Sequence, residues 1–211
     1  MELYRTVAKP ASETRVIEKS KFIGHIMPVE TREEAEAFIA DIRAEYRDAT
    51  HNVPAMVIGD GFQIQWGSDD GEPQGTSGAP VVQMLVKEGI TNVVIVITRY
   101  FGGIKLGTGG LVRAYTSTAA ATLEAAGICA VYEGCAVEAE IEYSFLAMLQ
   151  KLEGDMYTID NLEYGEKVTA HIQCLRDREE EVRSLLMNIT SGGAVIKNTE
   201  YIHIKKLIEN N

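Results

Sequence analysis

An uncharged run, Asn92–Thr98, constrains the fold more than any other part of this sequence. Most of its members are β-branched, a composition that favours a strand. Because apolar residues occupy successive positions rather than alternate ones, the run predicts a strand covered on both faces. A glycine-rich loop follows, and then an Ala- and Thr-rich segment from about Gly109 to Ala126 that predicts a helix packed closely on a sheet. These segments together predict a mixed α/β fold around one buried strand.

The residues before this run predict further strands and helices. Val16–Ile17 and Phe22–Val29 are expected to form two short strands. Thr31 is expected to begin a helix, because Glu34 three residues later completes a capping box. The helix is expected to extend to about Tyr46. A hairpin is expected next, with strands at Val53–Ile58 and Phe62–Trp66. A helix is expected at Ala79–Lys87.

The last part of the chain predicts elements in the order βαββαβ, the plan of ferredoxin-like domains. The expected strands are Cys135–Tyr143, Met156–Tyr164, Val168–Cys174 and Ala194–Lys205. The expected helices are Phe145–Leu152 and a helix capped by Asp177 that runs to about Asn188. Since this set is complete in itself, we expect two domains, 1–131 and 132–211, joined near Ala130–Gly134.

Composition narrows the class of protein. No apolar run approaches the ~18 residues of a membrane-spanning helix, and the N-terminus lacks the layout of a signal peptide. We therefore expect a cytoplasmic protein without membrane contact. The net charge of −11 counts against a general nucleic-acid binder, which carries a basic surface. Since Cys129, Cys135 and Cys174 lack metal-ligand spacing, we expect them to be buried, reduced thiols.

An acidic loop, Ser68–Gly78, is the first candidate site. Its carboxylates Asp69, Asp70 and Glu72 are the oxygen ligands that a hard cation prefers, and they also suit acid–base chemistry. The spacing is not that of a calcium-binding EF-hand loop. A solvated loop with side-chain-stabilised turns explains the same residues. Thr76 lies near the end of this loop, where the next helix begins.

A glycine-rich loop within Thr98–Gly110 is the second candidate site. It follows the buried strand and opens a helix, where free backbone N–H groups and the helix dipole favour an anion. Arg99 and Lys105 add positive charge. The loop matches neither a Walker A sequence nor the dinucleotide fingerprint. Glycines that allow left-handed backbone angles in a tight loop are an equally good reading.

His51 and Asn52 precede a strand and are expected to converge on these loops. No Ser or Cys stands out as a nucleophile for the histidine. We also expect the two loops to lie side by side, so that Asp70 or Glu72 pairs with Arg99 or Lys105.

The segments Asp69–Gly78 and Thr98–Gly107 together closely resemble the signature of the IMPACT family, in its bacterial YigZ-type branch. Ala49–Asn52 and Lys21–Ile23 match the same pattern. The resemblance implies that the first domain has the fold of domain IV of elongation factor G, and that the second resembles domain V of that factor. It also implies a role in translation, since eukaryotic relatives regulate translation and the bacterial branch is expected to contact RNA or the ribosome.

Two functions remain open from the sequence. One is a non-enzymatic binding protein whose partner is the ribosome, RNA or a translation factor. The alternative is an enzyme that acts on a phosphorylated small molecule with a cation held by the acidic loop. A closed pocket containing His51, the carboxylates, Arg99 and Lys105 would favour the enzyme, whereas a shallow exposed patch would favour the binding protein. We assign no catalytic residue, metal ligand or cofactor, and the oligomeric state is left open. The candidate binding residues are His51, Asn52, Asp69, Asp70, Glu72, Thr76, Arg99, Tyr100, Gly102, Gly103, Lys105, Gly107 and Arg113.

Overall fold

The uncharged run forms the middle strand of a five-stranded sheet in the computed structural model, which describes residues 2–208. The strand order is β2-β3-β6-β4-β5, and every neighbouring pair is antiparallel. The strands are β2 (Ala11–Ile17), β3 (Ser20–Pro28), β4 (His51–Ile58), β5 (Ile64–Gly67) and β6 (Val93–Tyr100).

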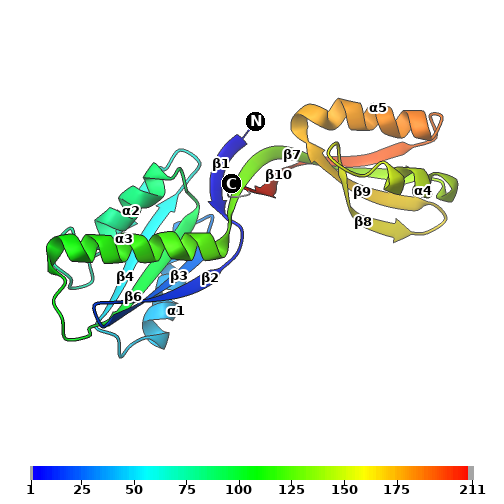
Figure 1. Cartoon of the computed structure of the whole chain (residues 1–211). Helices are drawn as coiled ribbons and strands as arrows, with labels where there is room; N and C mark the ends of the chain where they lie inside the picture. Colours follow the sequence, from blue (N-terminus) through cyan, green and yellow to red (C-terminus); the bar gives the residue numbers. More distant parts are fainter. Residues whose placement is uncertain (1, 209–211) are drawn as a thin grey trace. The chain divides into compact units, whose positions relative to one another are not determined.

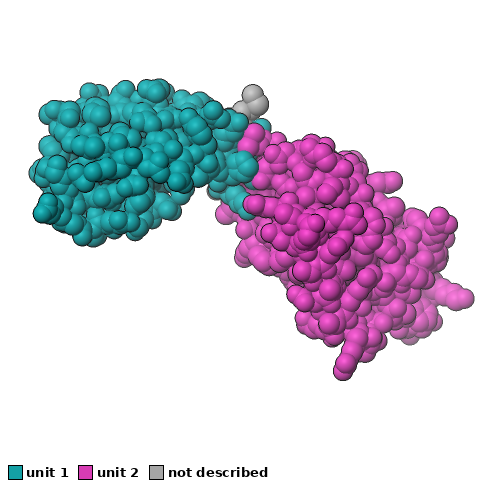
Figure 2. Space-filling view, turned by 180° about the vertical axis from the view of Figure 1, so that it is seen from behind, with its two compact units in different colours: residues 1–2, 131–205 teal, residues 3–130, 206–211 magenta. Residues whose placement is uncertain are grey.

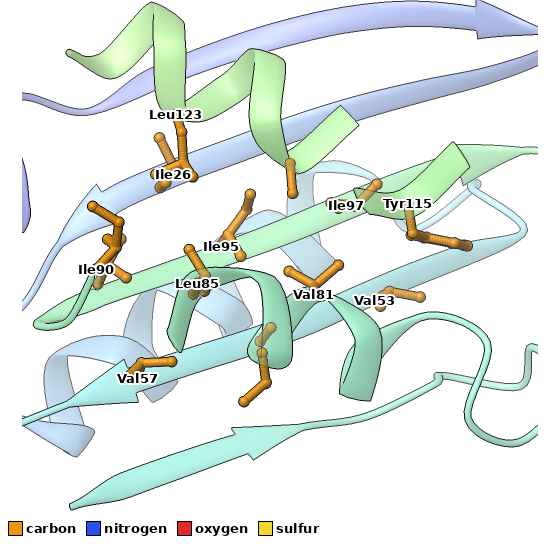
Figure 3. Packing of buried hydrophobic residues seen from close by; sticks show 14 of the residues in the cluster. Ile26, Val53, Val57, Val81, Leu85, Ile90, Ile95, Ile97, Tyr115 and Leu123 are labelled. Carbon is orange, nitrogen blue, oxygen red and sulfur yellow. The ribbon is translucent and has the colours of Figure 1, made fainter. Parts of the chain in front are cut away.

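Helices cover both faces of this sheet, as the run in β6 predicts (Figure 1). On one face Ile95 and Ile97 pack with residues of α2 (Gly78–Lys87) and α3 (Gly107–Ala126), among them Leu85 and Tyr115 (Figure 3). On the other face Val94 and Val96 pack with α1 (Arg32–Glu45). The sheet is antiparallel, so the continuous apolar run reflects burial on both faces and not parallel pairing.

The expected capping box at the start of α1 is present in a slightly displaced form. The backbone N–H of Glu34 donates to Thr31 Oγ1 at 3.2 Å. The Glu34 carboxylate accepts from the backbone N–H of Glu30 at 2.8 Å, one residue before the cap. Both bonds satisfy N–H groups that have no partner within the helix.

The β2–β3 hairpin is longer than the two short strands expected from the sequence. Ile17 pairs with Ser20, which leaves a turn of only Glu18 and Lys19. Both turn residues have positive φ values, +46° and +65°. Hairpin turns of this kind normally use Asn or Gly, because side chains disfavour the left-handed region.

The βαββαβ order expected for the last part of the chain is confirmed. The sheet order β10-β7-β9-β8 places the fourth strand of the motif beside the first, as in ferredoxin-like domains, and β1 (Glu2–Val7) also pairs with β7. The elements are β7 (Ile128–Ile141), α4 (Tyr143–Lys151), β8 (Thr158–Tyr164), β9 (Val168–Leu175), a 3₁₀ turn η1 (Arg176–Arg178), α5 (Glu179–Ile189) and β10 (Val195–Leu207).

Two local expectations were wrong, and one strand was missed. The strand expected to begin at Cys135 begins earlier, at Ile128, and so runs through the expected join at Ala130–Gly134. Asp177 does not cap α5, because it lies in the 3₁₀ turn that precedes the helix. Strand β1 was not predicted.

The described chain divides into two compact units (Figure 2). The larger unit comprises residues 3–130 and 206–208, and the smaller unit comprises residue 2 and residues 131–205. Over residues 2–208, no helix is long and apolar enough to cross a membrane. Cys129, Cys135 and Cys174 are buried free thiols.

Candidate functional site

The β-sheet of the larger unit aligns three residues of neighbouring strands directly opposite one another, two of them candidate-site residues. His51 on β4 and Phe22 on β3 are each paired with Arg99 on β6. Residues directly opposite on neighbouring strands point to the same face, so the three side chains share a face. This is the face covered by α3, because Phe22 packs edge-on against Tyr115 with ring centroids 5.3 Å apart.

A buried ion pair joins the two candidate loops. Arg99 Nη1 donates to Glu72 Oε1 at 2.5 Å, and the side chains are only 5% and 4% exposed. The hydroxyl of Tyr115 donates to the same oxygen at 2.8 Å. Burial, followed by the charge of Glu72, raises the pKa of Tyr115 above its ordinary value, which keeps the phenol protonated as a donor. The expectation that Asp70 or Glu72 pairs with Arg99 or Lys105 is confirmed for Glu72 and Arg99.

The guanidinium of Arg99 is held on several sides. Its Nη2 donates to Ser20 Oγ at 3.3 Å. The group lies over the rings of Phe22 and Phe101, at 5.3 and 5.5 Å from their centroids. Its Nε is buried without a hydrogen-bond partner among the described residues. These contacts fix the arginine as a structural element beneath the loop surface.

Asp69 closes the acidic loop on itself and accepts from backbone N–H groups at the start of α2, whose N-cap residue is Ser77. Its Oδ1 accepts from Ser77 N, Ser77 Oγ and Gly78 N at 3.1, 2.7 and 3.0 Å. Its Oδ2 accepts from Gly75 N at 2.7 Å. Burial opposes ionisation, but these hydrogen bonds outweigh it and lower the pKa of Asp69. The carboxylate therefore serves the helix start and not a ligand.

Asp70 points to different partners. Its carboxylate accepts from Arg43 Nη2 at 3.0 Å and from the backbone N–H of Asn52 at 2.7 Å. Its carbonyl oxygen lies 2.7 Å from His51 Nδ1, which must carry the proton because a carbonyl only accepts. His51 Nε2 then faces Glu72 Oε2 at 3.8 Å.

The three carboxylates do not form a common ligand set. Asp69 faces the start of α2, Asp70 faces α1 and β4, and Glu72 faces Arg99 and Tyr115. Over the described residues, no group of three His, Cys, Asp or Glu side chains could hold a metal ion. The geometry therefore gives no support to a cation held jointly by this loop.

Two further candidates have structural partners. Thr76 is buried and donates to the Pro73 carbonyl at 2.6 Å. Asn52 accepts from Thr98 Oγ1 at 2.7 Å and donates to the Tyr46 carbonyl at 3.0 Å. These contacts hold the loop and the end of α1 against the sheet.

The glycines of the second loop divide into two kinds. Gly102 lies against the β2–β3 turn, where a Cβ would come within 2.0 Å of the Lys19 carbonyl oxygen. Gly103 and Gly107 have φ values of +86° and +69°, and a Cβ at either would meet nothing within 4 Å. The first glycine is required by packing, whereas the other two leave open space above the loop.

Lys105 and Arg113 lie apart from the buried pair and face an open groove. Of the two cations expected to pair with the carboxylates only Arg99 does so, since no ion pair of Lys105 is found in the described part of the chain. The groove has a volume of about 530 Å³. It is lined by Ile17, Glu18, Ile104, Lys105, Leu106, Gly110, Arg113, Ala114 and Ser117. Tyr100 is engaged elsewhere, donating to Asp48 at 2.9 Å.

Sequence reasoning missed four residues of this region. Tyr115 carried one usable signal, since a buried phenol in an Ala- and Thr-rich helix requires a hydrogen-bond partner. Arg43, Ile17 and Glu18 carried none, because their partners lie far along the chain.

Comparisons with known proteins agree with the motifs. The family model described as the Impact N-terminal domain matches residues 18–123. The chain is 34% identical over 206 residues to the IMPACT family member YvyE of Bacillus subtilis, covering 97% of this chain and 95% of that protein. It is 44% identical over 117 residues to the IMPACT family member YigZ of Escherichia coli, covering 54% of this chain and 57% of that protein. A solved structure described as a hypothetical protein matches with a TM-score of 0.59 and 32% identity, over 93% of this chain and 97% of that chain. The chain therefore belongs to the IMPACT family, as its paired loop motifs predict.

Proposed function

We propose that this protein is a non-enzymatic binding protein of the translation apparatus, which contacts RNA, the ribosome or a translation factor through its glycine-rich loop. The observation that carries the proposal is the open groove beside Lys105 and Arg113. Family membership supports the link to translation, because the resemblance implies that role. Partners of this kind are found in the cytoplasm, the location expected from the sequence.

The arrangement of charges supports binding over catalysis. His51, Glu72 and Arg99 lie close together, but the guanidinium of Arg99 is already paired with Glu72 in a buried ion pair. Lys105 does not belong to this cluster and lines the groove instead. The phosphate clamp expected of the enzyme needs Arg99 and Lys105 together, facing one substrate. An open groove with separate cations fits a surface contact better.

The net charge of −11 predicts how such a contact behaves. The long-range field repels a polyanion, so binding must depend on a local patch of cations. We therefore expect binding that is strong only at low ionic strength, because each phosphate contact releases counterions.

Co-sedimentation of the full-length protein with ribosomes at low salt tests the proposal. We expect the protein to pellet with ribosomes, and the double variant Lys105→Ala/Arg113→Ala to pellet several-fold less. Lys87→Ala is the matched control, since Lys87 is an exposed cation in the last turn of α2. If the parent protein stays in the supernatant, or if the control loses as much as the double variant, the proposal is wrong.

A further inference from the structure

The groove beside the glycine-rich loop has three walls of different chemistry. One wall is the β2–β3 turn with Ile17 and Glu18, the second is the loop with Ile104 and Lys105, and the third is the start of α3 with Arg113. We propose that this groove binds a nucleotide unit by its phosphate, either within single-stranded RNA or as a free nucleotide. The inference rests on the proposed function and specifies the ligand of the same surface.

Cations that lack an acidic partner surround the groove. In the described structure neither Lys105 nor Arg113 has an ion pair or a side-chain hydrogen bond. Arg15 reaches the rim, where its Nη1 donates to the carbonyl of the lining residue Ser117 at 3.2 Å. The single acidic member of the lining is Glu18. In a chain with net charge −11, three cations around one groove favour an anion there.

The start of α3 adds backbone donors to the same wall. Its cap residue is Leu106, which has no side-chain hydrogen bond to the helix, and the first turn contains no acidic residue. In α2 the equivalent N–H groups are satisfied by the Asp69 carboxylate. The N–H groups at the start of α3 are thus available to phosphate oxygens, with Lys105 and Arg113 beside them.

Gly109 precedes the lining residue Gly110 and does not itself line the groove, and the space over its backbone is empty of protein. It lies in the first turn, its φ is not positive, and a Cβ there would meet nothing within 4 Å. Neither backbone geometry nor packing therefore requires glycine, although glycine disfavours a helix relative to alanine. An incoming ligand that approaches the backbone closely explains the missing side chain.

The remaining lining fits the sugar and base of a nucleotide. Ile17, Ile104, Leu106 and Ala114 provide apolar surface next to the cations. The volume of about 530 Å³ lies within the range of roughly 300–1,000 Å³ typical of small-molecule sites. One nucleotide can therefore place its phosphate at the helix start and its base against the apolar wall.

Fluorescence anisotropy with a 5′-labelled single-stranded RNA of about a dozen nucleotides tests the inference on the full-length protein at low salt. Gly109→Ala is the decisive variant. We expect it to melt at or above the parent temperature while binding the RNA at least five-fold more weakly. Gly154→Ala is the matched control, because that glycine also has nothing within 4 Å of its Cβ and lies in the smaller unit. Arg113→Ala should weaken binding as well.

Competition separates the two sources of the phosphate. Unlabelled adenosine monophosphate should displace the RNA, whereas adenosine should not. A free nucleotide that binds as tightly as the RNA supports a small-molecule ligand, and an RNA that binds at least ten-fold more tightly supports a strand. Equal competition by adenosine and adenosine monophosphate would overturn the phosphate assignment.

The same variants distinguish this inference from the proposed function. If Gly109→Ala and Arg113→Ala bind RNA and nucleotide like the parent, or if the parent binds neither, the groove is not a nucleotide site. Ribosome co-sedimentation that persists in that case leaves the proposed function standing. If the parent protein neither binds RNA and nucleotide nor pellets with ribosomes, both this inference and the proposed function are wrong.

Discussion

The two loops of the larger unit occupy similar positions in the chain but use their charges differently. Both contain several glycines, follow a strand and lead into a helix, but the acidic loop has three charged residues and the glycine-rich loop Phe101–Gly110 has one, Lys105. In the acidic loop each carboxylate has a partner within the chain, namely the α2 N-terminus, Arg43 with Asn52, and Arg99 with Tyr115. In the glycine-rich loop Lys105 has no such partner among the described residues, and the helix that follows is uncapped.

The difference shows that charge density alone does not locate a binding surface. The loop with the more prominent charges, Ser68–Gly78, uses them to hold its own shape. The loop Phe101–Gly110 has a single charge, Lys105, and leaves it exposed. The ion pair between Glu72 and Arg99 joins the two loops, so the acidic loop helps to position the loop for which we propose a binding role.

Removal of the arginine in the buried pair should have the largest effect. Arg99→Ala leaves the Glu72 carboxylate buried without its cation, and losses on the order of 3–5 kcal/mol in unfolding free energy are typical of such changes. Urea denaturation followed by Trp66 fluorescence measures this, because the single tryptophan lies on β5 of the larger unit.

The double variant Arg99→Ala/Glu72→Gln is the control. It removes the uncompensated charge, so it should be more stable than Arg99→Ala alone. An Arg99→Ala protein with the parent's denaturation midpoint would show that the pair does not hold the acidic loop, and the contrast between the loops would fail.

Loss of the Asp69 carboxylate should have the next largest effect. Asp69→Ala removes the acceptor for the backbone N–H groups at the start of α2 and should lower the unfolding free energy by about 1–2 kcal/mol at pH 7, as the loss of a cap does. The pKa of Asp69 is lowered in the folded protein, so its stabilising contribution is complete above its ordinary pKa and disappears as the pH falls through the lowered value. The gap between parent and variant should therefore narrow in acid, measured as urea midpoints from pH 7 to pH 2.

Asp41→Ala provides the comparison for this series, since Asp41 is an exposed carboxylate on α1. It should follow the parent at every pH. A constant gap between the parent and Asp69→Ala across the series would mean that the ionised carboxylate contributes nothing beyond its packing.

The predictable parts of the fold are those in which cause and effect lie close in sequence. Thr31 and Glu34 are three residues apart, and their capping bonds follow from local geometry. The apolar run of β6 predicts burial on both faces because successive residues of a strand point to opposite faces, and all of them in this run are apolar. The break between the first two strands was expected between Ile17 and Phe22, but the left-handed backbone of its turn residues Glu18 and Lys19 escaped prediction, since neither residue is typical of that conformation.

The site was predicted in part, and the error has a structural cause. The pairing across the loops assumed that the strands before them are neighbours. The acidic loop follows β5, which is separated from β6 by β4. Glu72 still reaches Arg99 at the end of β6, whereas Lys105 lies further along its loop, near α3. Tyr115 joins the pair from α3, a contact that no local pattern specifies.

The smallest expected effect compares one cation beside each loop. Arg43 pairs with Asp70 at 3.0 Å while both side chains are partly exposed, so Arg43→Ala should lower the unfolding free energy by about 0.2–1 kcal/mol. Lys105 has no ion pair in the described chain, and Lys105→Ala should stay within about 0.5 kcal/mol of the parent. The order of the two variants should be reversed in ribosome co-sedimentation: Lys105→Ala should pellet less than the parent, and Arg43→Ala should pellet about as much as the parent. Thermal melts and pelleting of the two variants side by side decide this, since a Lys105→Ala protein that is destabilised yet pellets normally would make the glycine-rich loop structural like its neighbour.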